Sequence, residues 1–175
     1  MAASFTKTSN FRSKATNHGR IYESVALDSY CEATCTQVTR NAGIHVCVDH
    51  PFLACSPDGL AGEEKLEVKC PYVARDMIIS PATVPYLNSD SHEVLHLDAT
   101  HKYYYQVQGA MLCTSAKSCD FVVWTHKDMV IVDVPRNDCF ISNMLSKLKH
   151  FFNCYFQEAL LNRFYYLYTD KYVLS

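Results

Sequence analysis

Apolar residues that recur every three or four positions predict three helices in this chain. We expect the first over about residues 17–38, the second over 99–113 and the third over 140–164. The stripe of the first helix consists of Ile21, Val25 with Ala26, Ser29 and Ala33. The third helix is strongly amphipathic. One face of it consists of Ile141, Leu145, Leu148, Phe152, Tyr155 and Ala159.

Short runs rich in β-branched and aromatic residues predict strands between these helices. The runs cover residues 44–48, 52–55, 66–70, 121–125 and 129–134. Gly59 and Gly62 predict a turn after the second run. Residues 76–98 contain Pro81, Pro85 and mixed polar groups, which predict a long loop or a variable insertion. The order helix, strands, helix, strands, helix favours an α/β or α+β fold, with a central mixed sheet flanked by helices.

The composition indicates a globular chain rather than a disordered or repetitive one. The chain has 175 residues, of which 49% are hydrophobic and 19% are charged. We expect a basic flexible arm over 1–16 and a single domain over 17–175. We find no apolar run of about 20 residues and no secretory signal, so we expect an intracellular protein with no membrane partner, in the nucleus or the cytoplasm. The nine cysteines contain no C-x-x-C pair, and we expect reduced thiols, most of them in the core.

The net charge of −2 does not by itself indicate a strongly basic nucleic-acid binder, but the distribution of the charges matters more than their sum. Lys7, Arg12, Lys14 and Arg20 all precede Glu23, the first carboxylate. This segment is suited to contact phosphates, and it is equally well explained as a solvated basic arm.

Two carboxylates and a lysine are predicted to meet at one hairpin. Asp58 ends one strand, and Glu67 and Lys69 share a face of the next, because side chains alternate along a strand. A hairpin across 59–65 brings Asp58 beside Glu67. Crowded carboxylates and the Val68 carbonyl suit a hard divalent ion such as Mg²⁺. The alternative is an exposed hairpin with a weak Glu–Lys pair.

A longer set of motifs resembles the lambda-exonuclease and YqaJ-like viral recombinase family of PD-(D/E)xK nucleases. The specific part is Ser56-Pro57-Asp58-Gly59-Leu60 followed by Leu66-Glu67-Val68-Lys69-Cys70-Pro71. Two outer motifs also match in order, His18-Gly19-Arg20-x-x-Glu23-x-x-Ala26 and Tyr105-Gln106-Val107-Gln108-x-x-Met111. The resemblance covers roughly residues 17–160.

The resemblance implies a restriction-endonuclease-like core and a Mg²⁺-dependent deoxyribonuclease that hydrolyses phosphodiester bonds. One or two Mg²⁺ ions are implied, and Mn²⁺ can substitute. The lambda-like branch degrades one strand of duplex DNA from a free 5′ end and serves recombination or repair. It implies double-stranded DNA as the substrate, a homo-oligomer of three subunits and a single-strand annealing partner.

The family's motifs also imply roles for individual residues. Asp58 and Glu67 would hold the metal with the Val68 backbone carbonyl, and Glu23 would support it directly or through water. Lys69 would contact the attacking water. Gln106, the first glutamine of its motif, would orient the water or the phosphate, whereas Gln108 points about 200° away on a helix. The residues we expect to contact DNA are Arg12, Lys14, Arg20 and His101.

One part of the family pattern is absent, which leaves alternatives open. Relatives usually carry an upstream segment with an Arg and a Ser/Thr-rich turn that grips the DNA end, and here only Arg12-Ser13-Lys14 offers a substitute. The alternative function is a catalytically silent or truncated DNA-binding or assembly module of a recombination system or mobile element. A further alternative is an endonuclease of the same fold, because fold and motif do not fix polarity.

Overall fold

The computed structural model describes residues 13–163 of the chain. Within these residues the chain divides into two compact units, the first ending at Asp138 and the second beginning at Cys139. The first contains every strand of the described residues and the helices α1 (Lys14–Thr34) and α2 (Lys102–Thr114). Over the same described range, no helix has the length and apolar character needed to cross a membrane.

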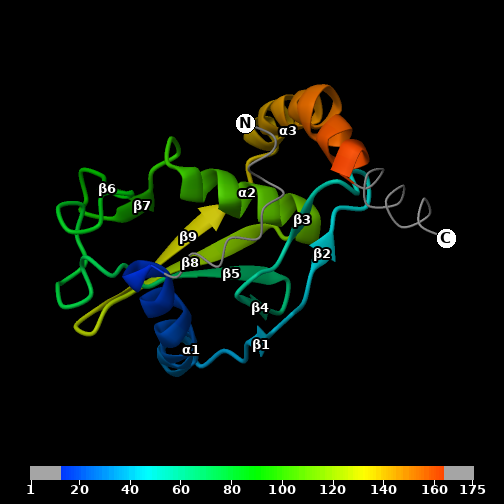
Figure 1. The fold of residues 1–175 in the computed structure, drawn as a ribbon. Helices are drawn as coiled ribbons and strands as arrows, with labels where there is room; N and C mark the ends of the chain where they lie inside the picture. The colour runs from blue at the N-terminus through cyan, green and yellow to red at the C-terminus, as the bar shows by residue number, and fades with distance from the viewer. Residues whose placement is uncertain (1–12, 164–175) are drawn as a thin grey trace. The chain divides into compact units, whose positions relative to one another are not determined.

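A five-stranded mixed sheet forms the centre of the first unit (Figure 1). In spatial order its strands are β1 (Thr39–Arg40), β4 (Gly59–Ala61), β5 (Glu64–Lys69), β8 (Ser118–Trp124) and β9 (Met129–Pro135). The central pair, β5 and β8, is parallel, and the other pairs are antiparallel. The mixed sheet with flanking helices confirms the predicted fold class.

The two helices cover opposite faces of this sheet, because alternate strand residues point to opposite sides. On one face, Leu66 and Val122 pack in a cluster with Leu27 of α1. On the other face, Phe121 packs in a cluster with Met111 of α2. The parallel β5–β8 pair is therefore buried from both sides, as is usual for parallel strands.

The segment predicted as a long loop contributes to the core, so that prediction was wrong. It contains a small antiparallel hairpin of β6 (Leu87–Ser89) and β7 (Leu95–Leu97). Its buried apolar residues are Ile79, Val84, Tyr86, Leu87 and Leu97. They fall in short runs broken by prolines and polar residues, so they form no periodic pattern that a sequence reading detects.

Helix α1 buries a different face from the predicted stripe. Of the predicted stripe, Ile21 and Val25 are 53% and 40% exposed and Ala26 is buried, and Leu27 and Tyr30, which lie outside the stripe, are buried too. Tyr30 anchors the helix to the sheet, because its hydroxyl donates to Asp120 Oδ2 at 2.5 Å. The helix begins at Lys14, not at residue 17, because the Ser13 hydroxyl accepts from the Thr16 amide and caps its first turn.

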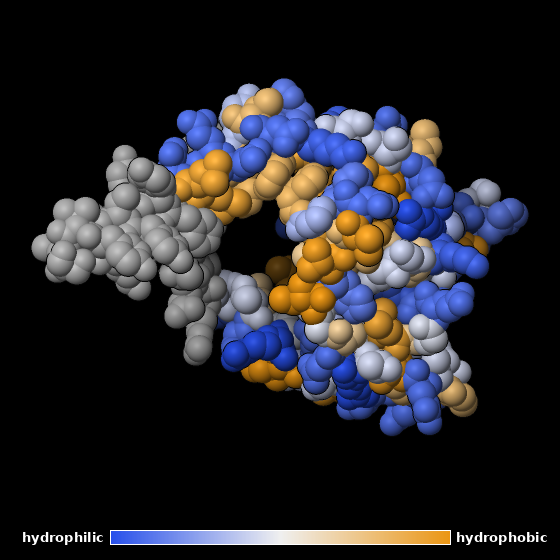
Figure 2. Space-filling model, turned by 90° about the vertical axis from the view of Figure 1, so that its right-hand side faces the viewer, coloured by the Kyte–Doolittle hydropathy of each residue, from blue (hydrophilic) through white to orange (hydrophobic). Residues whose placement is uncertain are grey.

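A second two-stranded sheet pairs β2 (His45–Val46) with β3 (Ala54–Cys55), within the predicted strand runs. Most cysteines are not core residues as predicted, since only Cys47 and Cys119 are fully buried. No disulfide forms among the described cysteines. Figure 2 shows hydrophobic residues reaching the surface among hydrophilic ones. Those with the largest exposure include Ile44 and Val48.

The third predicted helix is present as far as the structure describes it. Helix α3 (Asp138–Phe151) continues into a π-helical turn, η2 (Phe152–Phe156), and the chain stays helical to residue 163. Ile141 and Met144 are buried in α3, but Tyr155 is 57% exposed. The π-helical turn changes the angular step between residues, so the predicted apolar face does not continue through it.

Candidate active site

The β4–β5 hairpin places the two predicted carboxylates together. Gly59 pairs with Leu66, so the residue before Gly59, Asp58, lies opposite Glu67. Of the two glycines only Gly62 lies in the tight turn, which it forms with Glu63 and where its φ is 62°. Gly59 lies in β4 instead, where a Cβ atom would come within 2.6 Å of Val38 Cγ1. This glycine is needed for close packing rather than for the predicted turn.

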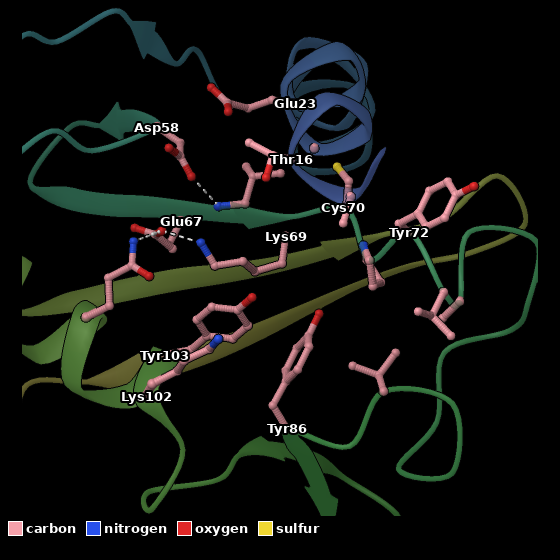
Figure 3. A pocket seen from close by; sticks show the side chains of 18 of the residues that line it. Thr16, Glu23, Asp58, Glu67, Lys69, Cys70, Tyr72, Tyr86, Lys102 and Tyr103 are labelled. Atoms are coloured by element: carbon pink, nitrogen blue, oxygen red, sulfur yellow. Dashed lines mark hydrogen bonds and ion pairs between the residues drawn. The ribbon is translucent and has the colours of Figure 1, made fainter. Parts of the chain in front are cut away.

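A pocket of about 870 Å³ collects the five residues predicted as catalytic. Glu23 comes from α1, Asp58 from the start of the hairpin, Glu67 and Lys69 from β5, and Gln106 from α2. Figure 3 shows the acidic side chains and Lys69 gathered around the end of β5. Residues far apart in the sequence therefore share one cavity.

Glu67 is the most connected side chain in the pocket. It is 3% exposed, and its Oε1 accepts from Lys69 Nζ at 2.6 Å and from Gln106 Nε2 at 2.5 Å. Its Oε2 accepts from Lys65 Nζ at 2.6 Å. Burial alone would raise the pKa of Glu67, but the two ammonium groups outweigh burial and lower the pKa below its ordinary value. Glu67 is therefore held as a carboxylate.

Asp58 is in the opposite electrostatic situation. Its Oδ2 accepts from the Val68 amide at 2.8 Å, which fixes the carboxylate beside β5. Burial and then the negative charge of Glu67 raise the pKa of Asp58 to about 6, although the Val68 amide and Lys69 oppose the rise. A positive ion beside Asp58 would remove this penalty on its charged form.

The donor set of the pocket fits a hard divalent ion. Within residues 13–163, no three His, Cys, Asp or Glu side chains gather closely enough to enclose an ion by themselves. The available donors are oxygens of Asp58, Glu67, Glu23 and the Val68 carbonyl, all of them in pocket-lining residues. Val68 presents its amide toward Asp58, and its carbonyl points to the same side of the strand. Few protein oxygens completed by water are typical of Mg²⁺.

Sequence reasoning missed Lys65 and, in the pocket wall, Tyr86. Lys65 is fully buried although it carries a charge. The Tyr103 ring lies 4.8 Å from Lys69 Nζ and 5.4 Å from Lys102 Nζ, and the buried Tyr86 hydroxyl has no hydrogen-bond partner in the described structure. The alternation Lys65, Glu67, Lys69 on one strand face was a signal for the buried lysine.

The four residues expected to contact DNA have different surroundings. Arg20 is exposed and lines the pocket, whereas Lys14 is exposed at the start of α1 and does not line it. His101 caps α2, accepts from the Tyr103 amide at 3.3 Å and stacks on Tyr86 with ring centroids 5.4 Å apart. Arg12 lies outside the described residues.

The two glutamines of α2 differ as expected from their helical spacing. Gln108 is fully buried, and its amide group donates to the Pro135 carbonyl and accepts from the Asn137 amide. We expect Gln108→Ala to lower the free energy of unfolding by about 1–3 kcal/mol, because it leaves buried backbone groups unpaired. Gln106→Ala, on the exposed side of the helix, should cost less than Gln108→Ala, because Glu67 Oε1 keeps its hydrogen bond from Lys69 when the Gln106 donor is removed. Urea unfolding measures both, and an equal loss would contradict the assignment.

The comparisons with known proteins identify a family and a fold. Residues 1–117 match the family of YqaJ-like viral recombinase domains. An alkaline exonuclease from Laribacter hongkongensis has a similar structure, with a TM-score of 0.67 and 22% identity over 99% of this chain and 82% of that one. Its complex with dAMP gives the same TM-score and identity, over 98% and 81%.

A phage-related exonuclease from Haemophilus somnus 129PT is also similar, with a TM-score of 0.55 and 16% identity over 79% of this chain and 70% of that one. At these identities the likeness concerns the fold. No curated protein matches the chain. The family match spans more than half of the residues and includes the β4–β5 hairpin and α2. The chain therefore belongs to the family of YqaJ-like viral recombinase domains.

Proposed function

We propose that the chain is a metal-dependent DNA nuclease, and specifically a 5′-to-3′ exonuclease on double-stranded DNA in recombination or repair. The observation that carries this proposal is the meeting of Asp58, Glu67, Lys69 and Gln106 in one pocket. Family membership supports it, and so does the similarity in fold to two exonucleases.

In this proposal the carboxylates hold one or two Mg²⁺ ions, for which Mn²⁺ can substitute. Asp58, Glu67 and the Val68 carbonyl are the ligands, and Glu23 supports them from α1 directly or through water. Such an ion, when bound, lowers the pKa of a water and neutralises charge on the reacting phosphate.

The side chains of the pocket position the reactants. Lys69 donates to Glu67 Oε1 and lies against the Tyr103 ring, so its ammonium group is held where it can orient the attacking water and stabilise a developing charge. Gln106 donates to the same oxygen, and its amide would orient the water or the phosphate. Alignment of this kind accounts for much of the rate that an enzyme gains in an in-line displacement.

The whole chain carries a net charge of −2, so its overall charge does not attract DNA. Positive side chains gathered at the pocket would hold the DNA instead. Arg20, Lys69 and Lys102 all line the pocket and would contact phosphates near the scissile bond. The other partners follow from the family resemblance. We propose double-stranded DNA with a free end, a trimer of this chain and a single-strand annealing partner.

End-labelled linear duplex DNA tests the function directly. We expect loss of label with Mg²⁺ or Mn²⁺ and none with EDTA, and a 5′ label should be released before a 3′ label. A covalently closed circle should stay intact, because an exonuclease needs an end. Cleavage of the circle would indicate an endonuclease, and intact linear DNA with folded protein would contradict the nuclease proposal.

The second candidate is a DNA-binding module without catalysis. One observation favours it: both Glu67 oxygens already accept hydrogen bonds from the chain's own lysines and glutamine. A gel shift on DNA ends at millimolar Mg²⁺ without degradation would support this module and exclude the exonuclease.

A further inference from the structure

Lys65 lies behind the pocket, on the face of the sheet that carries Glu67 and Lys69. Its exposure is 0%, and its neighbours across the sheet are Leu60 of β4 and Cys119 of β8. In the described chain, the pocket lining includes Glu67 and Lys69 but not Lys65. Lys65 is therefore a buried cation that neither solvent nor a substrate in the pocket reaches.

The side chain of Lys65 meets the pocket through Glu67. Lys65 Nζ donates to Oε2 of Glu67 at 2.6 Å, while Oε1 receives Lys69 and Gln106. The two oxygens thus differ in role: one faces the buried lysine, and the other faces donors that line the pocket. This division fixes the rotation of the carboxylate about its terminal bond.

Stability alone does not explain a lysine in this place. Apolar residues of similar volume usually serve a buried position at least as well as an ion pair, because the pair must be desolvated. The neighbours Leu60 and Cys119 would pack equally well against an apolar side chain. A common reason for such an arrangement is that the buried residue orients a neighbouring side chain that binds a metal ion.

We propose that Lys65 is a positioning residue that holds Glu67 Oε2, so that Oε1 stays directed toward the pocket for the divalent ion. This inference rests on the proposed function and adds a residue to it. Lys65 touches neither substrate nor ion and acts only through Glu67. Two consequences follow: Lys65 should affect ion binding and turnover, and it should leave the affinity for DNA unchanged.

The direction of the change in Mg²⁺ affinity distinguishes positioning from simple charge. A lysine that acts only as a positive charge repels the ion, so its removal would tighten Mg²⁺ binding. A positioning lysine orders Glu67, so Lys65→Met should weaken Mg²⁺ binding about tenfold and lower kcat about 10- to 100-fold, with KM for DNA unchanged. Calorimetric titration of the full chain with Mg²⁺, without DNA, measures the first effect.

Two further variants control for packing and for folding. Cys119→Ala removes an equally buried neighbour of Lys65 without changing charge, and it should change Mg²⁺ affinity less than threefold. Lys65→Met combined with Glu67→Gln leaves no unpaired buried ion, so this double variant should fold even where Lys65→Met does not. Its Mg²⁺ affinity should equal that of Glu67→Gln alone.

The outcomes separate this inference from the proposed function. Tighter or unchanged Mg²⁺ binding in Lys65→Met overturns the inference, and so does a further loss on adding Lys65→Met to Glu67→Gln. A wild-type chain that binds Mg²⁺ but degrades no DNA contradicts the nuclease, while the titrations still decide on Lys65. A wild-type chain that binds no Mg²⁺ overturns both.

Discussion

Asp58→Asn is expected to abolish DNA cleavage, with a rate at least about a thousandfold below that of the wild type. The substitution keeps the shape of the side chain and an oxygen that can accept from the Val68 amide. It removes the negative charge that the proposed ion requires at the centre of the site. The loss should therefore occur without unfolding.

Asp128→Asn is the matched control for this variant. Asp128 Oδ2 accepts from the Ile79 amide at 2.9 Å, much as Asp58 Oδ2 accepts from the Val68 amide, but Asp128 does not line the pocket. Initial rates on end-labelled duplex should stay within about threefold of wild type for Asp128→Asn. Full activity of Asp58→Asn, or an equal loss in both variants, would contradict the assigned role.

In the absence of metal, Asp58→Asn should be more stable than the wild type. Burial and Glu67 raise the pKa of Asp58 to about 6, so its charged form destabilises the fold near neutral pH. A shift of about two units corresponds to about 3 kcal/mol, and we expect Asp58→Asn to recover about 1–3 kcal/mol of that at pH 8. A gain in stability together with a loss of activity is typical of a group that serves catalysis rather than folding.

The centre of the site was predictable because it is local in sequence. Eight residues lie between Asp58 and Glu67, and the glycine-containing turn among them leaves few ways to pair the flanking strands. Alternation along β5 then places Glu67 and Lys69 on one face. Helical spacing likewise separated Gln106 from Gln108, and the structure places the first in the pocket and the second against the backbone of residues 135–137.

The predictions that failed concern features that depend on contacts between residues far apart in the sequence. The buried face of α1 is set by Tyr30 reaching Asp120 and by the fit of Ala26 and Leu27 against the sheet, not by the apolar stripe of the helix. The core role of residues 79–97 depends on packing against α2 and β8. Lys65 was missed because a lysine is ordinarily exposed, and its burial becomes possible only through Glu67.

The second large effect is a pH-dependent stabilisation by Mg²⁺. In the metal-free protein the pKa of Asp58 is about 6 against an ordinary 3.8. Its contribution to stability is thus complete below about pH 4 and is lost as the pH rises through 6. Mg²⁺ needs the deprotonated form, so its apparent affinity should be about tenfold lower at pH 5 than at pH 8.

Thermal unfolding without DNA measures this effect. Mg²⁺ at about 100 times its Kd should add about 2.7 kcal/mol, which raises Tm by several degrees at pH 8 and by clearly less at pH 5. NaCl of equal ionic strength is the control for screening. His18 also makes stability depend on pH, because burial lowers its pKa and so favours the folded state at higher pH. This contribution is the same in the wild type and in Asp58→Asn. The difference in Tm shift between the wild type and Asp58→Asn therefore isolates the contribution of Asp58. An equal Mg²⁺-induced Tm shift of the wild type at both pH values would exclude Asp58 as the group that binds the ion.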